Sequence, residues 1–115
     1  GTFYINDVVV RNYEGKSEIY LAAGTSSYRD ASQTFFNGEE YGIYKSNDGG
    51  NNWNKINVEF EGRIVQPIDL EISPENTIWM STTRDNRGLG AGLIYESDSS
   101  GSAFKAQPIL ILGIK

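Results

Sequence analysis

The sequence predicts an all-β protein in which a unit of about fifty residues occurs twice. Three observations indicate this. Thirteen glycines and 12% aromatic residues, with only three prolines, are typical of short strands joined by tight turns. No stretch of the chain keeps a helical period of 3.6 residues, so no helix is expected. A segment of the first half also recurs in the second half, where Ser97 repeats Ser46 at an offset of 51 residues.

The repeat extends over most of both halves. The best alignment pairs Tyr44 with Tyr95, Ser46 with Ser97, Gly50 with Gly101 and Trp53 with Phe104. Upstream of these pairs, residues 19–25 resemble residues 78–83, and residues 5–10 resemble residues 68–72. The two halves therefore derive from one structural unit.

Each unit is expected to contain four strands. The predicted strands cover residues 3–11, 18–24, 41–46 and 53–58, then 65–72, 77–82, 92–97 and 103–108. Four short strands in about fifty residues are typical of one blade of a β-propeller. The fold prediction is therefore a β-propeller with two four-stranded antiparallel blades, residues 1–62 and 63–115. The second range ends with the start of a further strand.

Two blades alone would leave two apolar faces open. Repeat folds bury each unit against the next and usually need about three or more units, while closed propellers have typically four to eight blades. The chain is therefore expected to be a fragment of a larger propeller, as its start without methionine and its apolar end at 108–114 suggest. The alternatives are a ring of several copies, or a larger protein that is only partly observed. The expected partners are the remaining blades or other protein chains.

The first unit contains a specific turn motif. Residues 46–53 fit the pattern Ser-x-Asp-x-Gly-x-x-Trp through Ser46, Asp48, Gly50 and Trp53. This resembles the Asp-box, or BNR repeat, of sialidases, sortilin-type receptors and secreted bacterial propellers. With its upstream strands, the resemblance covers nearly the whole chain.

The second copy of the motif is degenerate. It keeps Ser97 and Gly101, but Ser99 stands where the aspartate is expected and Phe104 where the tryptophan is expected. The weaker turn bond of a serine hydroxyl is expected to replace that of the carboxylate. This departure weakens the motif and leaves the repeat intact.

The physical role of the motif is to stabilise a hairpin. The carboxylate of Asp48 is expected to accept backbone N–H groups of the turn, while Gly49 and Gly50 allow positive φ. Trp53 would cover the hairpin with apolar surface. The segment lacks the alternating oxygen ligands of a calcium loop, so no metal is expected there. No cofactor is expected either. These residues are predicted to be structural, and no catalytic residue is assigned.

Composition excludes several classes of function. The formal charge of −5 and the absence of a long apolar segment argue against nucleic acid as a partner and against membrane insertion. The chain contains neither cysteine nor histidine. Disulfides, thiol nucleophiles, Cys/His zinc sites and histidine-based triads are therefore excluded.

The connections between the second and third strands of each unit carry the candidate binding residues. Residues 26–41 and 83–91 are expected on the face opposite the Asp-box turns, which in the resembling propellers binds ligands. The candidates are Tyr28, Arg29, Asp30, Phe35, Phe36, Arg84, Asp85 and Arg87. Arginine binds carboxylates through two parallel bonds, and aromatic rings stack on sugars. The alternative interpretation is that these are solvated loop charges with local Arg–Asp pairing.

The resemblance implies a function of the interaction type. The expected function is that of part of a secreted or cell-surface bacterial Asp-box β-propeller acting as a protein- or glycan-interaction module. The alternative is a fragment of a sialidase-like glycoside hydrolase, which would need several arginines, an acid and a Tyr–Glu nucleophile pair. A third hypothesis is a scaffold that supports appended domains.

Overall fold

The computed structural model describes residues 4–24, 41–85 and 87–108. These residues form ten strands, and none of them lies in a helix. The all-β prediction is therefore confirmed for this part of the chain. A search of the same residues finds no helix with the length and apolar character needed to cross a membrane.

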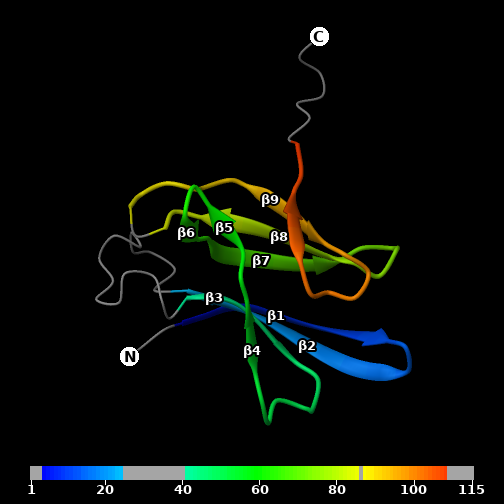
Figure 1. Cartoon of the computed structure of the whole chain (residues 1–115). Coiled ribbons are helices and arrows are strands. Elements are labelled where there is room, and N and C mark those ends of the chain that lie inside the picture. Colours follow the sequence, from blue (N-terminus) through cyan, green and yellow to red (C-terminus); the bar gives the residue numbers. More distant parts are fainter. Residues whose placement is uncertain (1–3, 25–40, 86, 109–115) are drawn as a thin grey trace.

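Two four-stranded antiparallel sheets account for most of the chain, and they lie one above the other (Figure 1). The first sheet has the order β1-β2-β3-β4: β1 (Tyr4–Tyr13), β2 (Lys16–Gly24), β3 (Gly42–Ser46) and β4 (Asn54–Ile56). The second has the order β10-β9-β8-β7: β7 (Gln66–Ile72), β8 (Ile78–Thr83), β9 (Ile94–Ser97) and β10 (Phe104–Ala106). All eight predicted strands thus have a counterpart.

A short hairpin that the sequence analysis did not predict joins the two sheets. It consists of β5 (Glu59–Phe60) and β6 (Arg63–Ile64). The two residues of its turn, Glu61 and Gly62, both have positive φ, which matches the twist of a tight hairpin. The predicted boundary between the units, after residue 62, falls in this hairpin.

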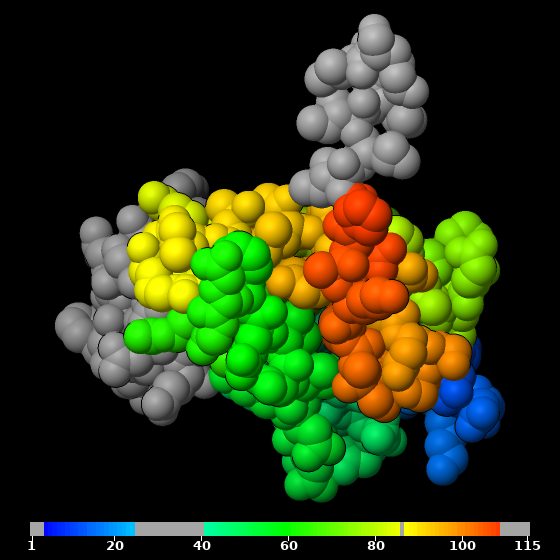
Figure 2. Space-filling model, turned by 45° about the horizontal axis from the view of Figure 1, so that its top comes forward, coloured from blue at the N-terminus to red at the C-terminus, as the bar shows by residue number. Residues whose placement is uncertain are grey.

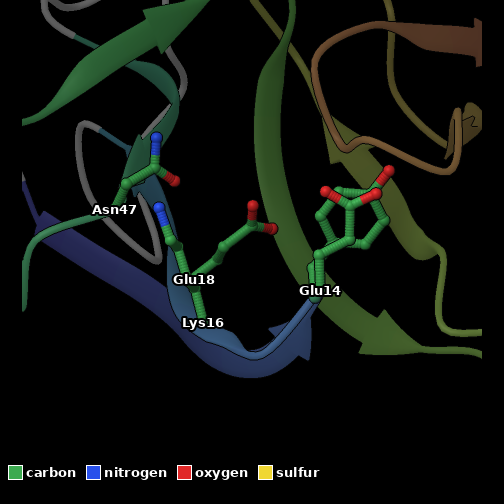
Figure 3. A pocket seen from close by; sticks show the side chains of 5 residues that line it. Glu14, Lys16, Glu18 and Asn47 are labelled. Atoms are coloured by element: carbon green, nitrogen blue, oxygen red, sulfur yellow. The ribbon is translucent and has the colours of Figure 1, made fainter.

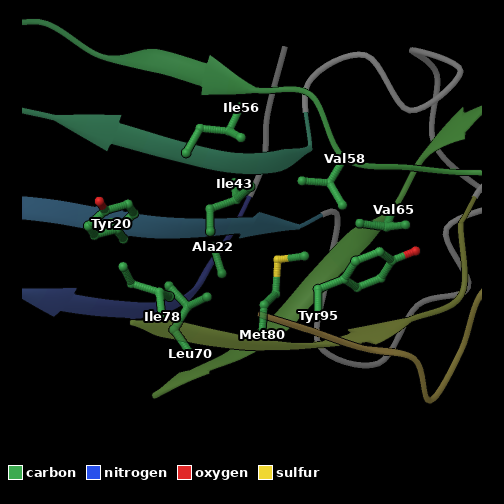
Figure 4. Packing of buried hydrophobic residues seen from close by; sticks show 10 residues of the cluster. All are labelled: Tyr20, Ala22, Ile43, Ile56, Val58, Val65, Leu70, Ile78, Met80 and Tyr95. Atoms are coloured by element: carbon green, nitrogen blue, oxygen red, sulfur yellow. The ribbon is translucent and has the colours of Figure 1, made fainter. Parts of the chain in front are cut away.

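The hydrophobic core lies between the two sheets and is drawn from both (Figure 4). Strand β7 packs against β1 and β2. The buried cluster consists of Tyr20, Ala22, Ile43, Ile56, Val58, Val65, Leu70, Ile78, Met80 and Tyr95. Because residues of one strand alternate between its two faces, each sheet has one inner face in this cluster and one outer face.

Both sheets carry a β-bulge at the same place in their first strand. In β1 the pairing jumps from Ile5↔Ala23 to Asp7↔Ala22, which leaves Asn6 as the extra residue. In β7 the jump between Pro67 and Asp69 leaves Ile68 as the extra residue. The two sheets thus share both the same strand order and the same bulge.

The bulge of β1 holds the two sheets together through polar bonds. The Oδ2 atom of Asp7 accepts the backbone N–H of Leu70 at 2.8 Å. The side-chain amide of Asn6 donates to the carbonyl of Pro67 at 3.0 Å. Since β7 is an edge strand, these bonds satisfy backbone groups that no neighbouring strand can reach.

Candidate functional site

The turn between β3 and β4 has the hydrogen bonding that the Asp-box motif predicts. The Oδ1 atom of Asp48 accepts the backbone N–H of Asn52 at 2.8 Å and the hydroxyl of Ser46 at 2.8 Å. The Oδ2 atom accepts the side-chain amide of Asn52. The Ser46 hydroxyl oxygen in turn accepts the N–H of Gly50 at 2.9 Å. The carboxylate is therefore occupied by the turn itself, as predicted.

These bonds also fix the charge state of Asp48. The backbone and side-chain N–H groups of Asn52, followed by the hydroxyl of Ser46, hold the pKa of Asp48 below its ordinary value. A general acid at neutral pH needs the opposite shift. The geometry and the pKa both support a structural role.

Trp53 closes the turn but is less buried than a core residue. Its Nε1–H donates to the carbonyl of Gly50 at 3.0 Å, and its ring lies over that glycine. The residue keeps 37% of its surface exposed. Trp53 therefore covers the outside of the hairpin, and its contribution to the free energy of unfolding is smaller than full burial would give.

The equivalent turn between β9 and β10 corrects one prediction. Its stabilising acceptor is Asp98, whose Oδ1 accepts the backbone N–H of Ser102 at 3.0 Å and the hydroxyl of Ser100 at 3.0 Å. The hydroxyl of Ser99 was expected to fill this role. Asp98 reaches the N–H four residues ahead, as Asp48 does, although it stands one position earlier in the motif. The four-residue spacing between the aspartate and the N–H that it accepts is thus the same in both turns. Only the position of the aspartate within the motif differs.

The second turn also packs against the first sheet through Gly101. A methyl group added at this glycine would overlap the hydroxyl of Tyr20 and crowd Nη2 of Arg11. Next to it, Nζ of Lys45 donates to the carbonyl of Ser100 at 2.8 Å. The glycine of the degenerate Asp-box therefore permits a close approach of the two sheets.

A buried cluster of charged and polar side chains lies at this contact. The Nε atom of Arg11 and the hydroxyl of Tyr20 both donate to Oε1 of Glu18, at 2.8 and 2.7 Å. Lys45 lies 3.3 Å from the other carboxylate oxygen. Burial opposes ionisation of Glu18, but the bonds from Tyr20, Arg11 and Lys45 outweigh it and lower its pKa. This cluster was not among the predicted sites; its signal in the sequence is the alternation of Glu18 and Tyr20 on one face of β2.

Arg11 also joins the two sheets. Its Nη1 donates to the backbone carbonyl of Asn76, which lies in the turn between β7 and β8. The side-chain amide of Asn76 returns a bond to the carbonyl of Asn12 at 2.7 Å. The guanidinium further lies 4.4 Å from the ring centre of Tyr13. Among the described residues, its Nη2 is the one buried side-chain N or O atom without a hydrogen-bond partner.

The pair of Tyr20 and Glu18 has the composition of a sialidase nucleophile but not its accessibility. Tyr20 has no exposed surface. Burial, followed by the hydrogen bond to Glu18, raises the pKa of its hydroxyl. A nucleophile must reach its substrate and lose its proton readily. Tyr20 meets neither condition, so this pair gives no support to a glycoside hydrolase.

A shallow hollow of about 260 Å³ borders the same cluster. It is lined by Tyr13, Glu14, Lys16, Glu18 and Asn47. Figure 3 shows Lys16 and Asn47 on one side of Glu18 and Glu14 on the other. The carboxylate of Glu18 is already bonded within the cluster. The hollow therefore offers weak polar contacts and no activated group; within the described ranges, no group of three or more acidic side chains is placed to hold a metal ion.

The described part of the predicted ligand-binding face is the connection between β8 and β9. Here Asp85 is buried, and its Oδ2 accepts the guanidinium of Arg87 at 2.6 Å. Arg87 also donates to the carbonyls of Phe60 and Glu61, both at 2.8 Å. Figure 2 shows the loop in yellow against the green segment that contains the β5–β6 hairpin. Asp85 and Arg87 thus fasten the hairpin to the loop.

The charge of Asp85 follows from these partners. Burial opposes ionisation of its carboxyl, but the side-chain and backbone N–H groups of Arg87 and the N–H of Leu89 lower its pKa. Arg84 is exposed on the same loop, and its carbonyl accepts the side-chain amide of Gln66 at 2.7 Å. The other predicted binding residues lie outside the described residues: Tyr28, Arg29, Asp30, Phe35 and Phe36.

The remaining members of the repeat occupy comparable positions in the two sheets. Ser46 and Ser97 are both buried at the ends of β3 and β9. The hydroxyl of Ser97 accepts the backbone N–H of Ile78 at 2.9 Å. Phe104, which replaces the tryptophan, begins β10 and packs half-buried against the core.

Comparison with protein-family models, with curated proteins and with solved structures gives no match for this chain.

Proposed function

We propose that this chain is part of a secreted or cell-surface bacterial Asp-box β-propeller and acts as a protein- or glycan-interaction module. The observation that carries the proposal is the recurrence of one turn at the same place in two equivalent sheets. In both turns an aspartate accepts the backbone N–H four residues ahead, at 2.8 Å for Asp48 and at 3.0 Å for Asp98. This turn gives rigidity to each sheet and leaves the opposite end of the sheet for binding.

The arrangement of the loops supports this division of roles. In the second sheet, the β8–β9 connection and the β9–β10 turn lie at opposite ends (Figure 1). Asp85 and Arg87 bond to each other in the β8–β9 connection, Arg87 also bonds to the β5–β6 hairpin, and Arg84 is an exposed residue of the same connection. An anchored loop that carries an exposed arginine suits recognition of a carboxylate, such as that of an acidic sugar.

The experiment is a binding assay on immobilised glycans, with sialylated and neutral glycans as probes. Because Arg29 and Arg84 are the guanidinium groups proposed to bind, the double variant Arg29→Ala/Arg84→Ala is expected to lose at least about tenfold in affinity for the acidic probes. The control is Lys105→Ala, which removes one exposed cation from strand β10.

Equal binding by the wild-type chain and the double variant would contradict the proposal that the β2–β3 and β8–β9 connections bind the ligand. The hydrolase alternative is tested in parallel with a fluorogenic sialoside. Because the Tyr20 hydroxyl is buried and has a raised pKa, no hydrolysis above the buffer rate is expected. Turnover that is lost in Tyr20→Phe would overturn the interaction module in favour of the enzyme.

A further inference from the structure

The outer face of the first sheet is mainly apolar and partly exposed, with Nζ of Lys55 on β4 lying 5.8 Å from the ring centre of Tyr44. Its cross-strand pairs follow from the register: Val8 with Leu21, Val10 with Ile19, and Leu21 with Tyr44. Val10 keeps 59% of its surface exposed. A contiguous apolar face of this kind on a β-sheet usually marks an interface.

The repeat identifies the counterpart of this face in the second sheet. Aligning the two bulges pairs Val8 with Leu70, Val10 with Ile72, Ile19 with Ile78, Leu21 with Met80 and Tyr44 with Tyr95. The cross-strand pairs in the second sheet are the same ones, for example Leu70 with Met80 and Met80 with Tyr95. Leu70 is 3% exposed, whereas Val8 is 46% exposed. The face that is buried in the second sheet is therefore the one left open in the first.

The surface that covers this face in the second sheet is also known. It is the inner face of the first sheet, where an aromatic, a small residue and an isoleucine lie side by side as Tyr20, Ala22 and Ile43. At the equivalent positions the outer face of the second sheet carries Trp79, Ser81 and Ile94. These three side chains are only half-buried. One chain thus presents both halves of one type of interface, on opposite sides.

We propose that a second copy of this chain packs the outer face of its β7–β10 sheet on the outer face of the β1–β4 sheet. The register is the one in which the two sheets pack within the chain. The internal interface supplies the model for this contact, which requires no ligand at the loops.

One polar bond is expected to recur with the packing. Within the chain, Asp7 beside its bulge accepts the N–H of Leu70. Asp69 stands beside the second bulge, on an exposed position of an edge strand. Its carboxylate in the second copy would lie next to the N–H of Val8, which is the counterpart of the Leu70 N–H. Within one chain this N–H donates to Oδ1 of Asp7 at 2.8 Å, so the new bond would share or replace that local one. The aspartate beside the bulge of each sheet would then accept an N–H from the first strand of the neighbouring sheet.

The new interface is more polar than the internal one. At equivalent positions of the two faces, Glu71 replaces Val9 and Ser81 replaces Ala22, while Glu96 reverses the charge of Lys45. The association is therefore expected to be weaker than the internal packing. It is also head-to-tail, so copies add until a ring closes. Since propellers close with typically four to eight blades, about two to four copies would complete a ring.

The first test is the molar mass of the wild-type chain in solution, measured by light scattering from roughly 1 to 100 µM. The expected result is a mass that rises with concentration above the 12.8 kDa of one chain. A mass of one chain over the whole range overturns the proposal.

Two variants test the geometry. Val10→Asp places a charge on the β1–β4 face, and Ser81→Lys places a long side chain on the β7–β10 face, opposite Asp69. Each variant alone is expected to be monomeric. A mixture of the two still has one intact face of each kind, so it is expected to form dimers of one copy of each variant. Two identical β1–β4 faces packing on each other would instead leave Ser81→Lys associated, and that result overturns the head-to-tail register.

A control variant distinguishes this interface from nonspecific hydrophobic association. Leu89→Asp removes an exposed apolar side chain from the β8–β9 connection, which lies outside the strands of both sheets. It is expected to associate as the wild-type chain does. All variants are checked for cooperative unfolding, since Val10 and Ser81 are partly exposed and their substitution is expected to preserve the fold. Dissociation by Leu89→Asp to the same extent as by Val10→Asp overturns the assignment of the face.

Discussion

At the scale of single residues, Gly101 shows how one absent methyl group sets the distance between two sheets. It is buried, has a φ of 73°, and faces the hydroxyl of Tyr20. Gly49 has nearly the same φ, 76°, but open space around it. The two positions therefore differ in packing while sharing the same backbone conformation.

This pair gives the first prediction. Gly49→Ala is expected to cost about 1 kcal/mol for the left-handed conformation alone. Gly101→Ala is expected to cost about 3 kcal/mol, because the sheets must also move apart. Urea unfolding of both variants measures the difference. Equal losses would contradict the close approach of the second turn to Tyr20.

Trp53 gives a second prediction at this scale. A fully buried tryptophan costs about 3–5 kcal/mol when it is replaced by alanine. Because Trp53 keeps 37% of its surface exposed, Trp53→Ala is expected to cost about 2 kcal/mol. Chemical denaturation checks this value, with Trp53→Phe as the variant that keeps a ring and loses the bond to Gly50. A loss of about 3–5 kcal/mol in the free energy of unfolding would show that the ring is covered in solution.

At the scale of structural elements, Arg87 holds the β5–β6 hairpin on the β8–β9 connection. A guanidinium can bond Asp85 and the carbonyls of Phe60 and Glu61 at once, as observed. A lysine at the same place has a single nitrogen and cannot span these acceptors. The hairpin has only two residue pairs of its own, so this anchor decides its stability.

The third prediction follows from this anchor. In Arg87→Lys, the amides of the β5–β6 hairpin are expected to exchange with solvent at least about tenfold faster, while those of β7 and β8 are unchanged. Hydrogen exchange followed by NMR resolves the two groups. Arg84→Lys, on the same loop, serves as the control. Unchanged exchange in the hairpin would mean that its own two residue pairs stabilise it without the bonds of Arg87.

The charged cluster on β1, β2 and β3 gives the fourth prediction, on pH. The pKa of Glu18 is lowered from its ordinary value of 4.5, with burial opposing and Tyr20, Arg11 and Lys45 outweighing it. A carboxyl with a lowered folded pKa stabilises the fold above its unfolded pKa and loses this contribution as pH falls through the folded value. Asp85 and Asp98 are shifted in the same direction. Stability is therefore expected to fall below about pH 4.5.

Thermal unfolding between about pH 7 and pH 3 measures this dependence. Glu18→Gln is expected to lower the midpoint at neutral pH, because the buried Arg11 loses its carboxylate partner, and to flatten the decline in acid. The exposed Glu75→Gln is the matched control. A decline of the same size in Glu18→Gln and wild type would place the acid sensitivity elsewhere.

At the scale of the whole molecule, the two sheets share one core, to which both contribute buried side chains. They are also joined by the bonds of Asp7 and Arg11 across the interface. A sheet that loses its partner would expose the whole cluster to water. The two sheets are therefore expected to fold as one cooperative unit.

The two tryptophans make this fifth prediction measurable, because Trp53 precedes β4 and Trp79 lies in β8. In Trp53→Phe the fluorescence reports the second sheet, and in Trp79→Phe it reports the first. After correction for the small effect of each substitution, each fluorescence transition is expected to coincide with the circular dichroism transition of the same variant. Separate transitions would show that the sheets unfold independently.

Local patterns in the sequence were sufficient for the strands and for the first turn. A turn such as residues 46–53 depends on groups within a few residues of each other, so the roles of Asp48, Gly49 and Gly50 could be predicted. The degenerate turn was misread, because an alignment by position selected Ser99, whereas the acceptor is the carboxylate of Asp98. The β5–β6 hairpin was missed because it is short and depends on Arg87, a residue far along the chain.

The sequence by itself determined the repeated four-strand unit, since alternation and turn chemistry act over short distances. Only the tertiary structure decided which faces meet. It buried Leu70 while leaving its counterpart Val8 exposed, and it placed Glu18 and Tyr20 between the sheets. It also turned Asp85 and Arg87 from candidate ligand contacts into an internal anchor. The physical reason is that burial and pairing depend on residues brought together from distant parts of the chain, which no local pattern records.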